Sequence, residues 1–190
     1  MGLKWWKFET DLGGGKELMA GVIITFIFGT RLHFFYYMSI LALDKVFISY
    51  FKLAYHDPRP YMIQSTITPE KCSSGFGNPS GHSHASSLFA VALFLDVFHG
   101  AQIGKSIERF FSKTVYFFCL GLAIFWAASI PYSRFVMGVH SLDQIIFGST
   151  LGLWSGFTMH FLVRDNLLKH IGSLMQSDEY ASMSPPDSPK

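Results

Sequence analysis

Apolar residues dominate five stretches of the chain, and short polar segments separate them. A helix rises about 1.5 Å per residue and a hydrocarbon core is about 30 Å thick, so the longer stretches suit membrane helices. The first would be only about 20 Å long as a helix, so it either spans with help or lies re-entrant. The stretches are residues 18–30, 34–51, 85–98, 114–130 and 145–163. This pattern predicts an all-α integral membrane helical bundle of about five membrane helices.

The two ends of the chain are more polar than the region between them. Residues 1–17 carry Trp5, Trp6 and several lysines, residue types that collect at the membrane–water interface. The C-terminal end is rich in Ser and Pro, a composition typical of disorder. We therefore expect an interfacial segment at 1–17, one membrane domain at 18–170 and a disordered tail at 171–190.

The composition favours a membrane protein and argues against nucleic-acid binding. Hydrophobic residues make up 49% of the 190 residues, while charged residues make up 15%, below the roughly 25% of soluble domains. The formal net charge is only +2, and no basic stripe is interleaved with aromatic residues. The two cysteines, Cys72 and Cys119, lack metal-ligand spacing, so we expect no metal site and no nucleic-acid partner.

Basic residues in the connector 99–113 predict the orientation of the helices. An excess of Lys and Arg marks a cytosolic loop. The connector holds three basic residues against one acidic residue, namely Lys105, Arg109 and Lys113 against Glu108. Counting helices from there places the connectors 52–82 and 131–144 together on the opposite, extracytoplasmic face of the membrane.

The two connectors on that face hold basic side chains beside a glycine-containing turn. Arginine offers a planar fork of donors that matches phosphate oxygens, and a helix N-terminus offers unpaired N–H groups that attract anions. Two histidines, whose ordinary pKa is about 6.5, can divide the roles of nucleophile and acid. The residues are Lys52, Arg59, Ser80, Gly81, His82, Arg134 and His140. They predict a phosphate site without a metal, although the turn at 75–82 alone also fits an ordinary helix start.

Other polar residues near these motifs have simpler interpretations. Asp44 and Lys45 lie inside an apolar stretch, where charges usually face other helices. Ser83 and His84 can continue a helix cap. The remaining candidates are interpreted as polar loop residues near the site, His56 and Asp57, or as interfacial histidines at helix ends, His33, His99, His160 and His170.

Three short motifs occur in a fixed order between residues 34 and 165. The first is Lys52, six residues, then Arg59 and Pro60. The other two are the run Pro79, Ser80, Gly81, His82 and the run Ser133, Arg134, five residues, His140. Together they resemble the signature motifs of the type 2 phosphatidic acid phosphatase superfamily, which includes vanadium haloperoxidases and glucose-6-phosphatase.

This resemblance implies a role for each matching residue. His140 matches the nucleophile that forms a phosphohistidine, and His82 matches the acid that protonates the leaving group and later activates water. The resemblance also implies a helical bundle, catalysis without a metal or other cofactor, and a set of phosphate-binding residues, Lys52, Arg59, Ser80, Gly81 and Arg134.

The chain departs from the family pattern four residues after the presumed nucleophile. The family usually places an Asp there, but this chain has Gln144, and its acid is Asp143, about 100° away on a helix. Gln144 can orient His140 through its carbonyl oxygen, which resembles the glucose-6-phosphatase branch. Alternatively, Asp143 serves through a shifted helix start, or the site is weakened.

The sequence therefore predicts a metal-independent membrane phosphatase that hydrolyses a lipid or small-molecule phosphate monoester or diphosphate. We expect it in the endoplasmic reticulum or another internal membrane, with its active face lumenal and membrane lipids as neighbours. The sequence is compatible with a homo-oligomer and also with a membrane complex. The alternatives are phosphate transfer between lipids, which uses the same residues, and a weakly active or inactive member that serves as a structural subunit.

Overall fold

The computed structural model describes residues 31–69, 75–103 and 113–164, together with scattered single positions. Those positions are 19, 22, 23, 72, 166, 167, 169, 170 and 173. The predicted interfacial segment 1–17 lies outside the described residues, as do almost all of the first apolar stretch and almost all of the predicted tail.

All regular secondary structure in the described ranges is helical. The elements are α3 (Arg31–Tyr55), α4 (Pro60–Ile63), α5 (Gly81–Ile103), α6 (Lys113–Val136), α7 (Leu142–Thr158) and its π-helical continuation η1 (Met159–Arg164). The predicted all-α fold is confirmed. Each long helix contains one of the predicted apolar stretches, and η1 completes the last of them.

The long helices extend beyond the apolar stretches that predicted them. Lys52 lies in the last turn of α3, and Arg134 lies in the last turn of α6, which continues through Pro131. Both basic residues were expected in connectors, so this expectation was wrong by about one turn. A basic side chain is compatible with a last turn, because its charge opposes the negative end of the helix dipole. The two cations are therefore held on helix ends.

Two helical segments are long and apolar enough to cross a membrane, judged by length and composition among the described residues. They are Phe34–Ile63 and Leu142–Arg164, and α6 adds the shorter apolar stretch Leu120–Val136. Several large apolar side chains on these helices are more than half exposed, among them Val46, Phe117, Ile124 and Leu162. An apolar exterior of this kind suits a lipid environment.

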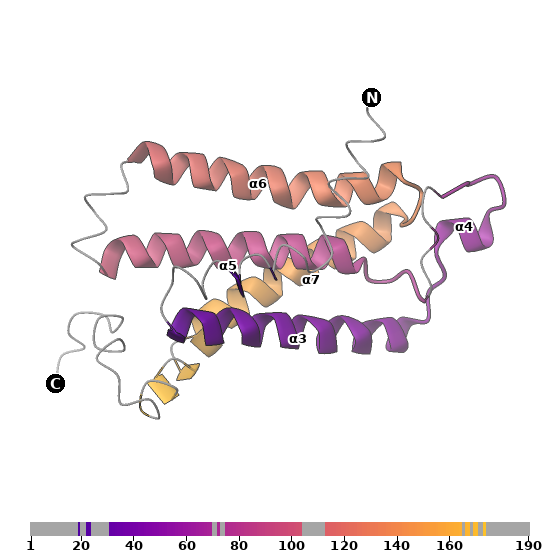
Figure 1. The fold of residues 1–190 in the computed structure, drawn as a ribbon. Helices are drawn as coiled ribbons and strands as arrows, with labels where there is room; N and C mark the ends of the chain where they lie inside the picture. The colour runs from indigo at the N-terminus through magenta and orange to yellow at the C-terminus, as the bar shows by residue number, and fades with distance from the viewer. Residues whose placement is uncertain are drawn as a thin grey trace.

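Helix α5 packs against both α6 and α7 and forms the centre of the bundle (Figure 1). The contact with α7 is close because glycines recur every four residues on α7, at Gly148, Gly152 and Gly156. A β-carbon on Gly148 would stand 2.6 Å from the carbonyl oxygen of Ser80. A β-carbon on Gly156 would stand 2.8 Å from the β-carbon of Val91. Only residues without a side chain allow this separation.

Four helix ends meet at one end of the bundle. The C-terminal ends of α3 and α6 lie there with the N-terminal ends of α5 and α7, and α4 lies beside them (Figure 1). The described parts of the two connectors, residues 56–69, 75–80 and 137–141, are therefore on the same side of the molecule. This is the arrangement that helix counting predicted, and it brings the three sequence motifs to one place.

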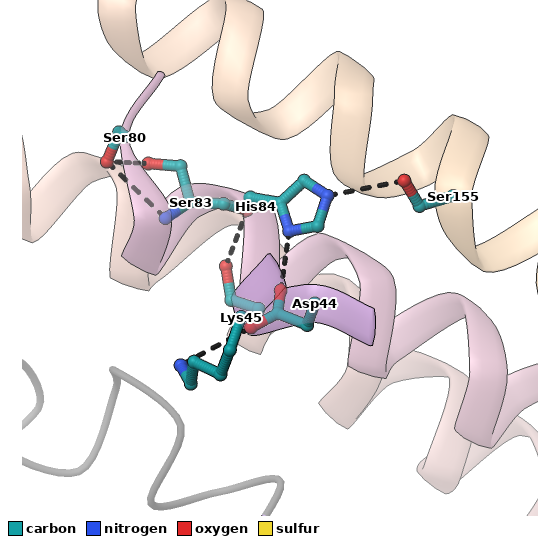
Figure 2. A network of polar contacts seen from close by, with 7 residues as sticks. Asp44, Lys45, Ser80, Ser83, His84 and Ser155 are labelled. Atoms are coloured by element: carbon teal, nitrogen blue, oxygen red, sulfur yellow. Dashed lines mark hydrogen bonds and ion pairs between the residues drawn. The ribbon is translucent and has the colours of Figure 1, made fainter. Parts of the chain in front are cut away.

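A buried polar network joins α3, α5 and α7 about one turn of α5 from this end (Figure 2). The Nδ1 atom of His84 lies 2.7 Å from Oδ1 of Asp44, and its Nε2 atom lies 3.3 Å from Oγ of Ser155. The three side chains are almost inaccessible to solvent. Asp44 thus faces neighbouring helices, as charges inside a span usually do. His84, which was interpreted as part of a helix cap, instead bridges three helices.

Candidate active site

The start of α5 is fixed by Ser80, which is fully buried. Its Oγ atom accepts hydrogen bonds from the backbone N–H of Ser83 at 3.5 Å and from the hydroxyl of Ser83 at 2.9 Å. Its own N–H donates to the carbonyl oxygen of Gln144 at 3.1 Å, which ties α5 to the start of α7. His82 lies in the first turn of α5 as a result, at the shared end of the bundle.

Arg59 links the three segments of the site. It precedes Pro60, which opens α4, and its side chain is only 3% exposed. Its Nε atom donates to the carbonyl oxygen of Gly75 at 3.1 Å, and its Nη1 atom donates to that of Val139 at 3.3 Å. The same Nη1 atom lies 3.2 Å from Nε2 of His140. A guanidinium that is expected to bind phosphate therefore faces the expected nucleophile.

Lys52 completes the cationic side of the site from the last turn of α3. A β-carbon built on Gly81 would lie 4.0 Å from the Nζ atom of Lys52, so this amine stands beside the N-terminus of α5. Arg134 is buried in the last turn of α6, and its carbonyl oxygen accepts a hydrogen bond from the N–H of Val139 at 3.3 Å. The amine of Lys52 thus stands beside the start of α5, and the charge of Arg134 acts on His82 in the first turn of the same helix.

The orientation of His140 depends on Gln144. The Nδ1 atom of His140 lies 3.1 Å from the Oε1 atom of Gln144. The amide nitrogen of Gln144 donates to Oδ2 of Asp57 at 2.9 Å and to the carbonyl oxygen of Pro58 at 2.8 Å. Since both partners of the nitrogen are acceptors, the amide oxygen must face His140, and Nδ1 carries the proton. The lone pair of the imidazole is then on Nε2, which faces Arg59.

Gln144 and Asp143 were the two candidates for orienting His140. Gln144 contacts the imidazole, and Asp143 does not. Asp143 is exposed on the first turn of α7, whereas Gln144 is 2% exposed. Gln144 also accepts a hydrogen bond from the N–H of Ser141 at 3.4 Å, as the residue at position N3 of a capping box does. The helix start is therefore not shifted in the way that would bring Asp143 to the imidazole.

Burial and positive charge keep His140 neutral. The residue lies in the loop between α6 and α7, where desolvation is the largest cause that lowers its pKa to about 3. The charges of Arg59, Arg134 and Lys52 lower the pKa further, while the hydrogen bond to Gln144 opposes them. A neutral imidazole retains the lone pair that a nucleophile needs.

The structure gathers the predicted site residues at one end of the bundle, where Asp143 alone of them is exposed. His82 lies within electrostatic reach of Arg134, His140 and Lys52. Sequence reasoning missed Asp57, which was interpreted as a loop residue but hydrogen-bonds Gln144. The signal was available, because an acid missing from one position of a motif invites a search for another nearby. In the described ranges, no three His, Cys, Asp or Glu side chains cluster as metal ligands.

Comparison with known proteins places these features in a family. Residues 33–167 match the PAP2 superfamily. The chain is 25% identical over 132 residues to the dolichyldiphosphatase of Saccharomyces cerevisiae, covering 68% of this chain and 51% of that protein. It is 31% identical over 98 residues to dolichyldiphosphatase 1 of Dictyostelium discoideum, covering 52% of this chain and 40% of that protein. The chain thus spans about half of the length of the first relative and two fifths of the second.

A solved structure has the same fold. It is the transmembrane PAP2-type phosphatidylglycerolphosphate phosphatase of Bacillus subtilis, which superposes with a TM-score of 0.67 at 19% sequence identity. The match covers 83% of this chain and 74% of that one. The family match spans the three motifs and all of the long helices described above, from α3 to α7. This chain belongs to the PAP2 superfamily, the type 2 phosphatidic acid phosphatase family that its motifs resemble.

Proposed function

We propose that this protein is a metal-independent membrane phosphatase that hydrolyses a lipid phosphate or diphosphate through a phosphohistidine at His140. One observation carries the proposal: the Nε2 atom of His140 bears the lone pair and lies 3.2 Å from the guanidinium of Arg59. Gln144 holds the opposite ring nitrogen at 3.1 Å. A nucleophile with a fixed tautomer and an adjacent phosphate-binding cation are the two parts that phosphoryl transfer requires.

The reaction proceeds in two displacements. In the first, the Nε2 lone pair of His140 forms a bond to phosphorus while the bond to the leaving oxygen breaks, and His82, which begins the cycle protonated, donates its extra proton to that oxygen. In the second, water attacks phosphorus, His82 takes back a proton, and the phosphorus–nitrogen bond breaks to release phosphate and neutral His140. Lys52, Arg59 and Arg134 offset the negative charge of the phosphoryl oxygens in both steps.

An apolar groove between α3, α5 and α7 favours a lipid as the substrate. Its volume is about 380 Å³, and its lining includes Ile40, Tyr50, Leu88 and Trp154. At about 1.5 Å per residue, the α3 part of the groove runs from about 3 Å to about 18 Å below Lys52. A hydrocarbon chain attached to a phosphate at the cations would lie at that depth. The names of the two curated relatives make dolichyl diphosphate the first candidate substrate.

The charges of the sequence support an orientation for the helices. The basic connector between α5 and α6 is placed in the cytosol, so the site at the opposite end of these helices faces the lumen. We propose an internal membrane such as the endoplasmic reticulum. Both assignments are tested by tagging each terminus and measuring whether the tag is protected from protease in sealed microsomes.

Phosphate release by the purified protein in detergent tests the proposed activity. The substrates are an isoprenyl diphosphate, phosphatidic acid, a sphingoid phosphate and glucose 6-phosphate, each with EDTA present. His140→Ala should reduce turnover by about a thousandfold or more, while His170→Ala, at an exposed histidine away from the site, should not. Loss of wild-type activity with EDTA would refute metal independence. No turnover of any substrate by folded protein would favour the structural-subunit alternative.

A further inference from the structure

Asp57 lies in the loop between α3 and α4 and makes two contacts toward the site. Its Oδ2 atom accepts a hydrogen bond from the amide nitrogen of Gln144 at 2.9 Å. Its carbonyl oxygen accepts one from the N–H of Gly77 at 2.7 Å. The first contact connects residues 87 positions apart, so it forms only in the folded bundle. Asp57 does not touch His140, and any effect on the nucleophile must pass through Gln144.

A side-chain amide can be turned by half a rotation, and only one of its two orientations serves His140. With the oxygen toward Nδ1, Gln144 accepts the Nδ1 proton; with the nitrogen toward Nδ1, two donors would face each other. Asp57 and the Pro58 carbonyl offer only acceptors to the other end of the amide. The turned amide would lose both hydrogen bonds and bring its oxygen against a carboxylate. Asp57 thereby selects the orientation that fixes the tautomer of His140.

The space around the amide is closed as well as polar. A β-carbon on Gly77 would stand 2.6 Å from both the nitrogen and the oxygen of the Gln144 side chain. The N–H of Gly77 is held by the carbonyl oxygen of Asp57, so the residue that orients the amide also fixes the backbone that packs on it. Gln144 is only 2% exposed in this enclosure. Rotation of the amide therefore requires movement of the Asp57 loop.

We propose that Asp57 is a positioning residue for the proposed phosphatase reaction, acting through Gln144 to hold His140 in its nucleophilic tautomer. The role depends on the function proposed above. In the family pattern a carboxylate contacts the imidazole directly, whereas here an amide stands between the carboxylate and the ring. The negative charge is thus moved one hydrogen bond further out, where it can still polarise the Gln144 carbonyl as the ring becomes cationic on phosphorylation.

Exchange of the amide and carboxylate groups between positions 144 and 57 tests the proposal. Gln144→Glu alone places two carboxylates at the 2.9 Å contact, so we expect kcat to fall by at least about tenfold. Adding Asp57→Asn should recover at least about tenfold of that loss, because the new amide donates to the carboxylate and the carboxylate accepts the Nδ1 proton. Asp57→Ala in the otherwise native chain should lower kcat by about 10- to 100-fold and change KM by less than about threefold.

The outcomes separate this proposal from the one on which it rests. Rescue of Gln144→Glu by Asp57→Asn supports the positioning role, because a residue needed only for folding would make the double variant worse than either single variant. A double variant no better than Gln144→Glu, or Asp57→Ala with more than half of native kcat, would overturn the role while His140→Ala still established the phosphatase. Native activity in His140→Ala would overturn both. The thermal midpoint of each variant in detergent checks folding.

Discussion

The Nη1 atom of Arg59 lies 3.2 Å from the Nε2 atom of His140, and Gln144 holds the other nitrogen of the same ring. The guanidinium therefore donates a hydrogen bond to the lone pair that the mechanism uses for attack. Phosphate oxygens compete for the same donor, and a charge-assisted bond to phosphate is stronger than one to neutral imidazole. In the proposed mechanism, binding of the substrate phosphate would therefore also free the lone pair of His140.

Arg59→Lys should reduce kcat/KM by about 100-fold. An ammonium group can replace the charge, but it lacks the planar fork that here reaches Gly75, Val139 and His140 at once. Inhibition by inorganic phosphate should weaken in the same variant. Steady-state kinetics and phosphate inhibition provide the measurement, with Lys169→Arg at an exposed position as the control. Equal kcat/KM for the variant and the native protein would contradict the role assigned to Arg59.

Gly77→Ala should lower kcat by about tenfold or more with little change in overall fold. The added β-carbon would collide with the Gln144 amide, which must move away from His140. Gly121→Ala is the matched control, because among the described residues nothing beyond its own stretch of α6 lies within 4 Å of its β-carbon position, and alanine favours a helix. Kinetics and circular dichroism of the two variants provide the comparison. A similar kcat in both would mean that the enclosure of Gln144 tolerates an extra carbon.

The stability of the protein should fall in acid partly because of His140. Burial and the neighbouring cations hold its pKa at about 3 in the folded state, whereas the unfolded value is about 6.5. The unfolded chain therefore binds the extra proton first as the pH falls. The stability that depends on a neutral His140 is fully present above about pH 6.5, and it is lost as the pH falls toward 3. On acidification from pH 7.5 to 4.5, the thermal midpoint of the native protein should fall by more than that of His140→Ala. A constant difference would refute this.

Asp44→Ala should destabilise the bundle while its neighbour Lys45→Ala should not. Removal of Asp44 leaves Nδ1 of His84 without its buried hydrogen-bond partner, and leaving a buried polar group unpaired costs about 1–3 kcal/mol. Lys45 also contacts Asp44, at 3.3 Å, but its side chain is 56% exposed, and exposed pairs contribute about 0–1 kcal/mol. Denaturation midpoints measure the difference. Specific activity per folded molecule should survive in both, and a selective loss in Asp44→Ala would instead indicate a catalytic part for the network.

Much of the site could be predicted from the sequence because its parts obey local rules. Apolar stretches indicated the helices, and counting those helices indicated which ends share a face. The placement of Lys52 and Arg134 was less accurate, since hydropathy does not mark a helix turn that carries a basic residue. The contacts of Asp57 and His84 were missed because each depends on partners far along the chain, at Gln144 and Asp44. Only packing of the helices brings such pairs together.

The side chain of Gln144 serves two structures at the same time: it accepts the N–H of Ser141 at the start of α7, and it holds the imidazole of His140. Fraying of this first turn would therefore also misalign the nucleophile. Ends of helices open more readily than their middles. The fraction of molecules competent for chemistry at any moment is thus tied to the opening equilibrium of a single turn, and amide exchange at the start of α7 should track turnover as temperature rises.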